Sequence, residues 1–185
     1  MGVFFGSHRL YLQRTQVLDL KGFAPHCSSL KNQHGERLVL TKLMVQPHRI
    51  LLVEENISDA SLLQKGFEKC SFPVQVSTAN AREEAKKMLG SASSRLPDLI
   101  LLGLDQPSES DWEWLVALKN QKSTKAIPVL VLLQAKTPHD YYTAYHHKAN
   151  CCISKPADPK DFETIAQAIG DFWLSIIELP SRKSW

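Results

Sequence analysis

Long apolar runs are missing from this sequence. No stretch approaches the ~18–20 consecutive apolar residues that a membrane-spanning helix needs, and the N-terminal residues lack the basic-then-apolar order of a secretory segment. The composition is globular, with 43% hydrophobic and 22% charged residues, and so does not have the low hydrophobicity of a disordered chain. We therefore expect a soluble cytoplasmic protein that does not bind membranes, with one domain of ordinary size and an additional segment.

Metal-binding cysteine patterns are also missing. The four cysteines are Cys27, Cys70, Cys151 and Cys152, and none forms a CxxC pair or has the histidine spacing typical of zinc sites. Cys151 and Cys152 are adjacent within an apolar segment, where a free cysteine behaves as a small core residue. We predict no redox or metal role for them.

A basic stripe is absent from most of the chain. Residues 1–48 contain six Lys and Arg against two Asp and Glu, whereas the remaining residues contain 16 against 17. This balance predicts that the main body does not bind nucleic acid. We expect residues 1–48 to form a poorly ordered basic extension, because a terminus without a core to dock on stays mobile. A domain over 49–180 and a short tail over 181–185 complete the predicted organisation.

The most informative stretch of the sequence is 97–107. An apolar run from Leu99 to Leu102 is bounded by Pro97 and Asp98 on one side and by Gly103 on the other. A short uninterrupted run between turn residues is typical of a strand buried on both faces. Because open parallel sheets hold their sites at the carboxyl ends of their strands, we expect any functional chemistry to lie around Gly103.

Strands and helices alternate five times from Arg49 onward. The strands are predicted at 50–53, 74–76, 99–102, 127–133 and 151–153, each followed by a helix. Short connections and continuous apolar strands predict an α/β fold, with a parallel sheet that has helices on both faces.

Local signals predict where several helices begin. Asn80 with Glu83 predicts one start, Ser110 with Glu113 forms a possible capping box for another, and Thr137-Pro138 predicts a third. Asp158-Pro159 predicts the start of the last helix. In the helix after residue 110 we expect Trp112, Leu115, Val116 and Leu118 to face inward and Trp114 to be partly exposed.

With these segments placed, the chain from Arg49 to about Pro180 resembles the receiver domain of bacterial response regulators. Within that family it is most similar to the stand-alone type paired with bacterial and cyanobacterial phytochromes. The matching segments, in order, are Ile50–Asn56, Pro97–Leu102, Ile127–Val129, Ala149–Asn150, Lys155–Pro156 and Gly170–Leu174. The resemblance implies a flavodoxin-like (CheY-like) five-stranded sheet of order 2-1-3-4-5. It also implies a role in two-component phosphorelay signalling with a sensor histidine kinase as partner, and no enzyme activity.

The resemblance also assigns positions around the site, and several carry unexpected residues. Glu54 and Glu55 match the acidic pair that helps to hold Mg²⁺. Lys155 matches the lysine that contacts the phosphoryl group, and the bond before Pro156 matches a cis peptide. Gly103 stands where the phosphoacceptor aspartate belongs. Leu133 stands where the family has a Ser or Thr hydroxyl, and Cys152 stands where it has an aromatic residue.

These departures predict a pseudo-receiver that cannot be phosphorylated. Phosphoryl transfer requires a carboxylate nucleophile, which glycine does not supply, and the loss of one anchor weakens Mg²⁺ binding. We expect no cofactor, Mg²⁺ bound weakly if at all, and a single metal-free conformation in which Lys155 pairs with Glu55. One alternative is a phospho-accepting regulator that uses a displaced carboxylate such as Asp105. Another is a flavin- or nucleotide-binding enzyme, although the acidic pair after the first strand would repel phosphate.

The last predicted helix is apolar around more than one face. At ~100° per residue, Leu174 lies outside the inward stripe, and we expect Phe172, Trp173 and Leu174 to form an interface. Excess apolar surface on a helix often indicates a partner site. The expected use is a homodimer, or docking onto a kinase.

Overall fold

The computed structural model divides the chain into two compact units, residues 1–46 and 47–185. It describes residues 3–5, 8–10, 30–31, 37–38, 46–91, 95–134, 137–177 and 179. The first unit contains two antiparallel strand pairs: β1 (Val3–Phe5) with β2 (His8–Leu10), and β3 (Leu30–Lys31) with β4 (Arg37–Leu38). Most of the predicted extension and all of the predicted tail lie outside the described residues, so these two expectations stay untested.

The second unit is built on a five-stranded parallel sheet. Its strands are β5 (His48–Val53), β6 (Val74–Ala79), β7 (Leu99–Leu104), β8 (Val129–Leu133) and β9 (Cys151–Ser154). They lie in the order β6-β5-β7-β8-β9, all parallel. This is the predicted order 2-1-3-4-5, so the predicted fold class is confirmed. The second strand extends beyond the predicted residue 76 to Ala79. The fourth strand begins at Val129 and not at residue 127, because Pro128 has no amide hydrogen to donate to the sheet.

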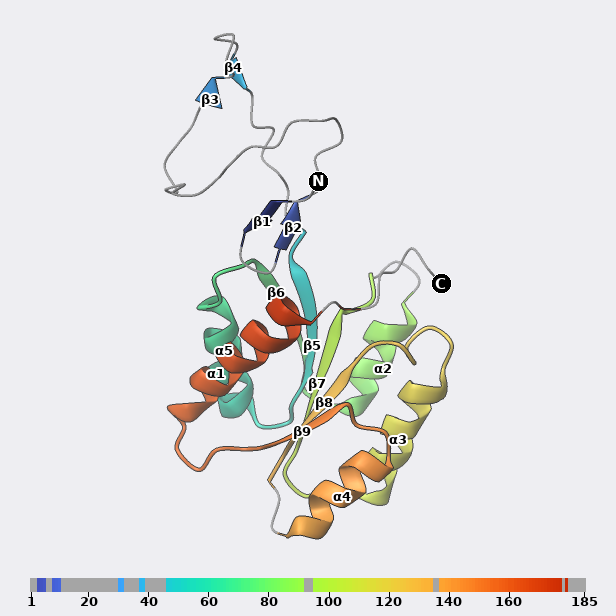
Figure 1. The fold of residues 1–185 in the computed structure, drawn as a ribbon. Coiled ribbons are helices and arrows are strands. Elements are labelled where there is room, and N and C mark those ends of the chain that lie inside the picture. The colour runs from blue at the N-terminus through green and yellow to red at the C-terminus, as the bar shows by residue number, and fades with distance from the viewer. Residues whose placement is uncertain are drawn as a thin grey trace. The chain divides into compact units, whose positions relative to one another are not determined.

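Helices cover both faces of this sheet (Figure 1). The elements are α1 (Ile57–Glu68), α2 (Arg82–Gly90), α3 (Glu109–Asn120), α4 (Pro138–His146), α5 (Asp161–Ile169) and the π-helix η1 (Gly170–Ile176). The helices α1 and α5 lie on one face, and α2, α3 and α4 lie on the other. The alternating side chains of each strand therefore divide the core into two clusters. For example, Leu52 faces α1 and α5, whereas its neighbour Val53 faces the opposite layer.

Two helix starts differ from the sequence prediction. The capping box of α3 uses Ser108 and Asp111 rather than Ser110 and Glu113, so the helix begins two residues earlier than expected. In α2 the residue before the helix is Ala81, and the Asn80 amide donates to Glu84 Oε2, so Glu83 plays no capping part. The predicted start at Thr137-Pro138 is confirmed.

The last helix begins later than Asp158, at Asp161, after a turn. Within α3, Val116 is only half-buried, and Trp114 is 6% exposed rather than partly exposed as predicted. Trp114 packs, together with Trp112 and Leu115, in the core cluster on the α2, α3 and α4 face of the sheet.

The π-helix overturns the prediction that Leu174 belongs to an interface. Leu174 is 3% exposed and packs in the core cluster beneath α1 and α5. The prediction assumed α-helical geometry, but from Gly170 the backbone forms the wider i→i+5 turn, as in the Ile177 N–H donating to Phe172 O at 3.1 Å. This change of period turns Leu174 inward. Phe172 stays 49% exposed and Trp173 is half-buried.

We predict that Leu174→Ala lowers the free energy of unfolding by about 2–5 kcal/mol, because it empties a buried leucine position. The matched control is Ile176→Ala, two residues along at a side chain 65% exposed, which we expect to change stability by no more than about 0.5 kcal/mol. Urea denaturation measures both. Equal effects would show that the helix keeps its α-period and that Leu174 faces solvent.

A second prediction concerns the contact between α1 and α5. A β-carbon on Gly66 would lie 2.6 Å from Glu163 O and 2.6 Å from Ala166 Cβ. Gly66→Ala should therefore push the helices apart and cost about 1–3 kcal/mol in urea denaturation. Gly90→Ala is the control, because a β-carbon there meets nothing within 4 Å. A stability unchanged by Gly66→Ala would contradict this packing.

Candidate functional site

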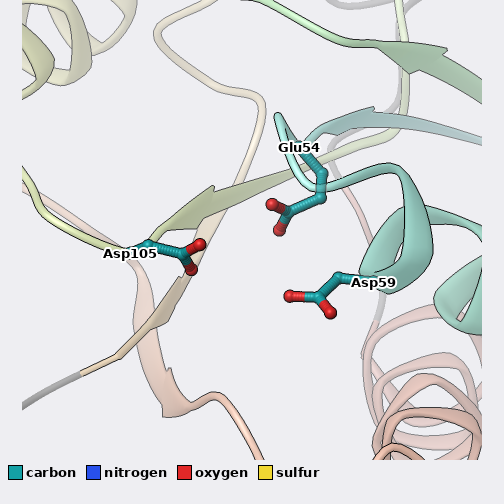
Figure 2. Close-up of side chains that lie close together, drawn as sticks. All are labelled: Glu54, Asp59 and Asp105. Carbon is teal, nitrogen blue, oxygen red and sulfur yellow. The ribbon is translucent and has the colours of Figure 1, made fainter.

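The candidate site lies at the carboxyl ends of strands β5, β7 and β9 of the parallel sheet. Glu54 follows β5, Asp105 follows β7, and Lys155 follows β9. Asp59 joins them from the first turn of α1. One carboxylate oxygen from each of Glu54, Asp59 and Asp105 lies within 4.8 Å of the others, and Figure 2 shows the three side chains pointing toward one another. The strand-end position expected from the sequence is therefore where the charged groups gather.

The turn between β5 and α1 folds Glu54 back over the sheet. The Asn56 side chain caps α1, its Oδ1 accepting from the amides of Ser58 at 3.0 Å and Asp59 at 3.3 Å. The Asn56 amide in turn donates to Glu54 Oε1 at 3.0 Å. The Glu54 amide continues the sheet by donating to Ala79 O. Hydrogen bonds thus fix both the backbone amide and the carboxylate of Glu54, and the residue is only 2% exposed.

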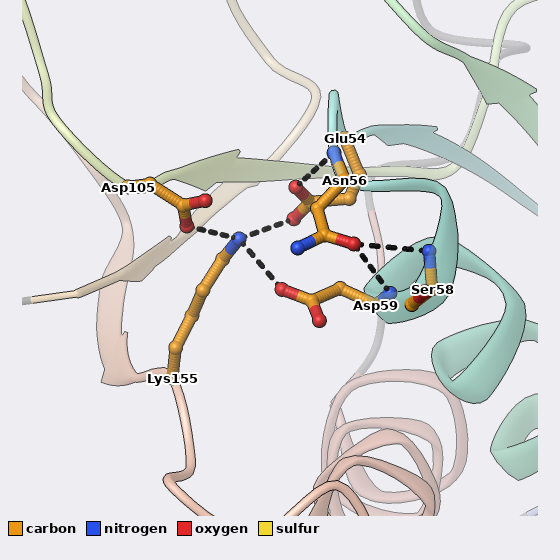
Figure 3. Close-up of polar contacts among 6 residues, drawn as sticks. All are labelled: Glu54, Asn56, Ser58, Asp59, Asp105 and Lys155. Atoms are coloured by element: carbon orange, nitrogen blue, oxygen red, sulfur yellow. Dashed lines mark hydrogen bonds and ion pairs between the residues drawn. The ribbon is translucent and has the colours of Figure 1, made fainter.

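A single ammonium group lies among the three carboxylates (Figure 3). Lys155 Nζ is 2.8 Å from Glu54 Oε2, 3.1 Å from Asp59 Oδ2 and 2.6 Å from Asp105 Oδ1. The Lys155 side chain is 4% exposed, and its amide donates to Leu133 O. Toward Asp59 and Asp105 the ammonium donates hydrogen bonds, whereas toward Glu54 Oε2 the contact is an ion pair without hydrogen-bond alignment. Lys155 therefore links the end of β9 by ion pairs to the ends of β5 and β7 and to α1.

Burial and pairing act in opposite directions on these groups. Burial raises the pKa of Glu54, and the contact with the Lys155 ammonium and the hydrogen bond from the Asn56 amide only partly offset it. Burial lowers the pKa of Lys155, but its interactions with Asp105, Glu54 and Asp59 outweigh burial, so the net shift is upward. The proton therefore stays on Lys155, which keeps the charge that the carboxylates require.

Position 103 is filled from a neighbouring strand. A β-carbon built on Gly103 would overlap Glu54 Oε2 and lie 2.7 Å from Glu54 Cδ. The Glu54 carboxylate therefore occupies the space that any side chain at 103 would need. The sequence predicts no carboxylate at position 103, and the structure shows that the Glu54 carboxylate lies in the space beside it.

The predicted pairing of Lys155 with Glu55 is wrong. Glu55 is exposed, and Lys155 contacts Glu54, Asp59 and Asp105 instead. Sequence reasoning missed Asp59. A signal was available, because α1 begins directly after the first-strand turn and its first-turn side chains reach the same edge of the sheet.

The remaining predicted positions lie around this group without taking part in it. Leu133 is fully buried at the end of β8, and Cys152 is half-buried, its pKa raised to about 11 by burial and by Cys151. The thiol is therefore protonated at neutral pH and unsuited to redox chemistry. The described residues contain only trans peptide bonds, so the bond before Pro156 is trans and not cis.

The residues present do not fit Mg²⁺. This ion requires a strict octahedron of oxygen ligands and retains several of its waters. Here the Lys155 ammonium already lies at 2.6–3.1 Å from all three carboxylates. Glu55, at the position expected to supply a direct ligand, is not among them. A divalent ion would have to displace a buried lysine.

Comparison with known proteins defines the class. No protein-family model matches the chain. The response regulator Rcp1 of Synechocystis sp. is 30% identical over 139 residues, covering 73% of this chain and 95% of Rcp1. The probable methanogenesis regulatory protein FilR2 of Methanothrix harundinacea is 29% identical over 131 residues, covering 69% of this chain and 84% of FilR2. The chain belongs to the response regulators and contains their receiver domain.

Solved structures place the chain within that class. The phosphorylated cyanobacterial phytochrome response regulator RcpA is 34% identical, with a TM-score of 0.67 over 74% of this chain and all of that one. The Mn²⁺-bound form of Rcp1 is 30% identical, with a TM-score of 0.66 over 73% and 100%. The receiver domain is thus close to the cyanobacterial phytochrome response regulators. Among the described residues, no helix is long and apolar enough to cross a bilayer.

We predict that millimolar Mg²⁺ leaves the melting temperature of the wild-type protein unchanged, because the Lys155 ammonium already lies between the three carboxylates. Lys155→Met should destabilise the protein by about 3–5 kcal/mol, since it leaves buried carboxylates unpaired, and Mg²⁺ should restore part of that loss. Differential scanning fluorimetry with and without Mg²⁺ measures both. A rise of several degrees for the wild-type protein would contradict the assignment of Lys155 as the resident cation.

Proposed function

We propose that this protein is a pseudo-receiver, which acts in two-component signalling by binding a partner and not by accepting a phosphoryl group. The observation that carries the proposal is the space above Gly103. It lacks the nucleophile that phosphoryl transfer requires, and the Glu54 carboxylate lies in the place of the missing side chain. A phosphoryl donor therefore meets neither an acceptor at 103 nor room for one.

The contrast with the relatives supports this proposal. RcpA was solved in its phosphorylated form, and Rcp1 with Mn²⁺ bound. Those states add an anion and a cation to the receiver. In this chain the Glu54 carboxylate takes up the space of the side chain missing at 103 and lies 2.8 Å from Lys155 Nζ. Leu133, at the position of the family's hydroxyl donor, is a fully buried apolar side chain.

The proposed partner is a sensor histidine kinase or another signalling protein, and the proposed assembly includes a homodimer. Support comes from the apolar surface at the end of the last helix, where Phe172 is 49% and Ile176 is 65% exposed. Trp173 is half-buried beside them, its ring edge-on to Phe172. Exposed apolar groups of this kind favour contact with another protein.

Phosphoryl transfer to Asp105 is the second candidate, and one observation favours it. Asp105 Oδ1 is 2.6 Å from Lys155 Nζ, and the Asp105 side chain is 45% exposed. A donor can therefore reach this carboxylate, unlike the buried Glu54. The same ammonium is shared with two other carboxylates, which leaves less of its charge for an incoming phosphoryl group. The flavin or nucleotide alternative gains no support from the relatives or from this acidic site.

We expect acetyl phosphate to leave the wild-type protein unlabelled. Purified protein would be incubated with acetyl phosphate and Mg²⁺ and followed by intact mass and by phosphate-affinity gel. RcpA, which was solved in its phosphorylated form, is treated in parallel to show that the donor is active. An adduct on the wild-type protein that is lost in Asp105→Asn would establish the second candidate, and an adduct retained in that variant would place the acceptor elsewhere. Either adduct contradicts the pseudo-receiver.

A further inference from the structure

We infer that Glu54 is an internal carboxylate ligand of Lys155, which has taken the place of the missing side chain at 103 and closes the pocket to external anions. This inference rests on the proposed function and adds the residue that keeps the site closed. Gly103 and Glu54 then form one feature, because the glycine provides the space that the glutamate fills.

Burial distinguishes Glu54 from the other two carboxylates. Glu54 is 2% exposed, whereas the side chains of Asp59 and Asp105 are 16% and 45% exposed. A carboxylate leaves water only where its partners compensate for the lost hydration. Glu54 has two such partners, the Asn56 amide on Oε1 and the Lys155 ammonium beside Oε2. It is the innermost anion of the group.

The position of Glu54 depends on the absence of a side chain at 103. A β-carbon there would overlap Oε2, the atom that faces Lys155, and crowd Cδ. The contact is with the end of a side chain, so Glu54 could move aside, but only by giving up its place beside the ammonium. An aspartate at 103 and an inward Glu54 therefore exclude each other, and the site holds one carboxylate at this position.

It follows that the carboxylate beside Lys155 can be supplied by a group other than Glu54. If Glu54 is truncated, Lys155 faces a space bounded by Gly103 that matches a small carboxylate such as acetate. The same space accepts an aspartate grown from position 103. The structure thus assigns to the pocket a small-anion site that Glu54 occupies in the native protein.

The test is a double-mutant cycle read by melting temperature. Glu54→Ala should lower the melting temperature by about 5–10 °C through loss of a buried ion-pair partner, and Gly103→Asp should lower it by displacing Glu54. The combined variant should be more stable than the sum of the two changes predicts. Glu113→Ala, at an exposed glutamate in α3, is the matched control and should shift the value by less than about 2 °C.

Acetate provides a second measurement on the same variants. Sodium acetate should raise the melting temperature of Glu54→Ala above its value in sodium chloride of equal ionic strength, and neutral acetamide should not. The wild-type protein and Glu113→Ala should show no acetate effect. Rescue that is equal for all variants would contradict a specific anion site.

A further variant tests whether a side chain at 103 displaces Glu54, and this test does not depend on Glu54→Ala folding. Gly103→Ala in the otherwise wild-type protein should lower the melting temperature, because one methyl group already displaces Glu54. An unchanged value for Gly103→Ala, or additive effects in the cycle, would overturn the inference. Labelling of the wild-type protein by acetyl phosphate would instead overturn the proposed function. The double-mutant cycle would still decide whether Glu54 occupies the space beside Gly103.

Discussion

One ammonium group among three carboxylates is the constraint on which the functional edge of this domain depends. Lys155 reaches from the end of β9 to Glu54 after β5, Asp59 in α1 and Asp105 after β7. Carboxylates this close repel one another unless a cation lies between them. Receivers can take that cation from solution, as the Mn²⁺-bound Rcp1 does. In this structure the cation among the carboxylates is the Lys155 ammonium, and under the proposed function it keeps this edge of the sheet closed.

The glycine at 103 and the inward glutamate at 54 are best understood together. A missing nucleophile alone would leave a small empty space beside a buried ammonium, which is an unfavourable arrangement for the charge. The Glu54 carboxylate fills that space, and the Asn56 amide and the cap of α1 hold it there. The inward turn of Glu54 thus supplies a carboxylate at the place where residue 103 has none.

Sequence reasoning reached the fold and the place of the site but not its arrangement. Continuous apolar strands such as Leu99–Leu102 are read directly from the residues, and their order follows from the family resemblance. The inward turn of Glu54 depends on the cap formed by Asn56, which no periodicity encodes. Two overlapping capping boxes begin at Ser108 and Ser110, and only packing decides between them. Leu174 was misplaced because a π-helix breaks the period that the prediction assumed.

A site filled from within also limits how this domain can signal. A ligand shifts a conformational equilibrium only by the difference in its affinity for the two states. Phosphorylation would supply such a difference through new charge near Lys155, but Lys155 already has three anionic partners. Under the proposed function, any change in output must therefore come from a partner that contacts the surface, such as the exposed Phe172 and Ile176. Regulation then depends on which partner is present and at what concentration, since the domain itself keeps one charge state.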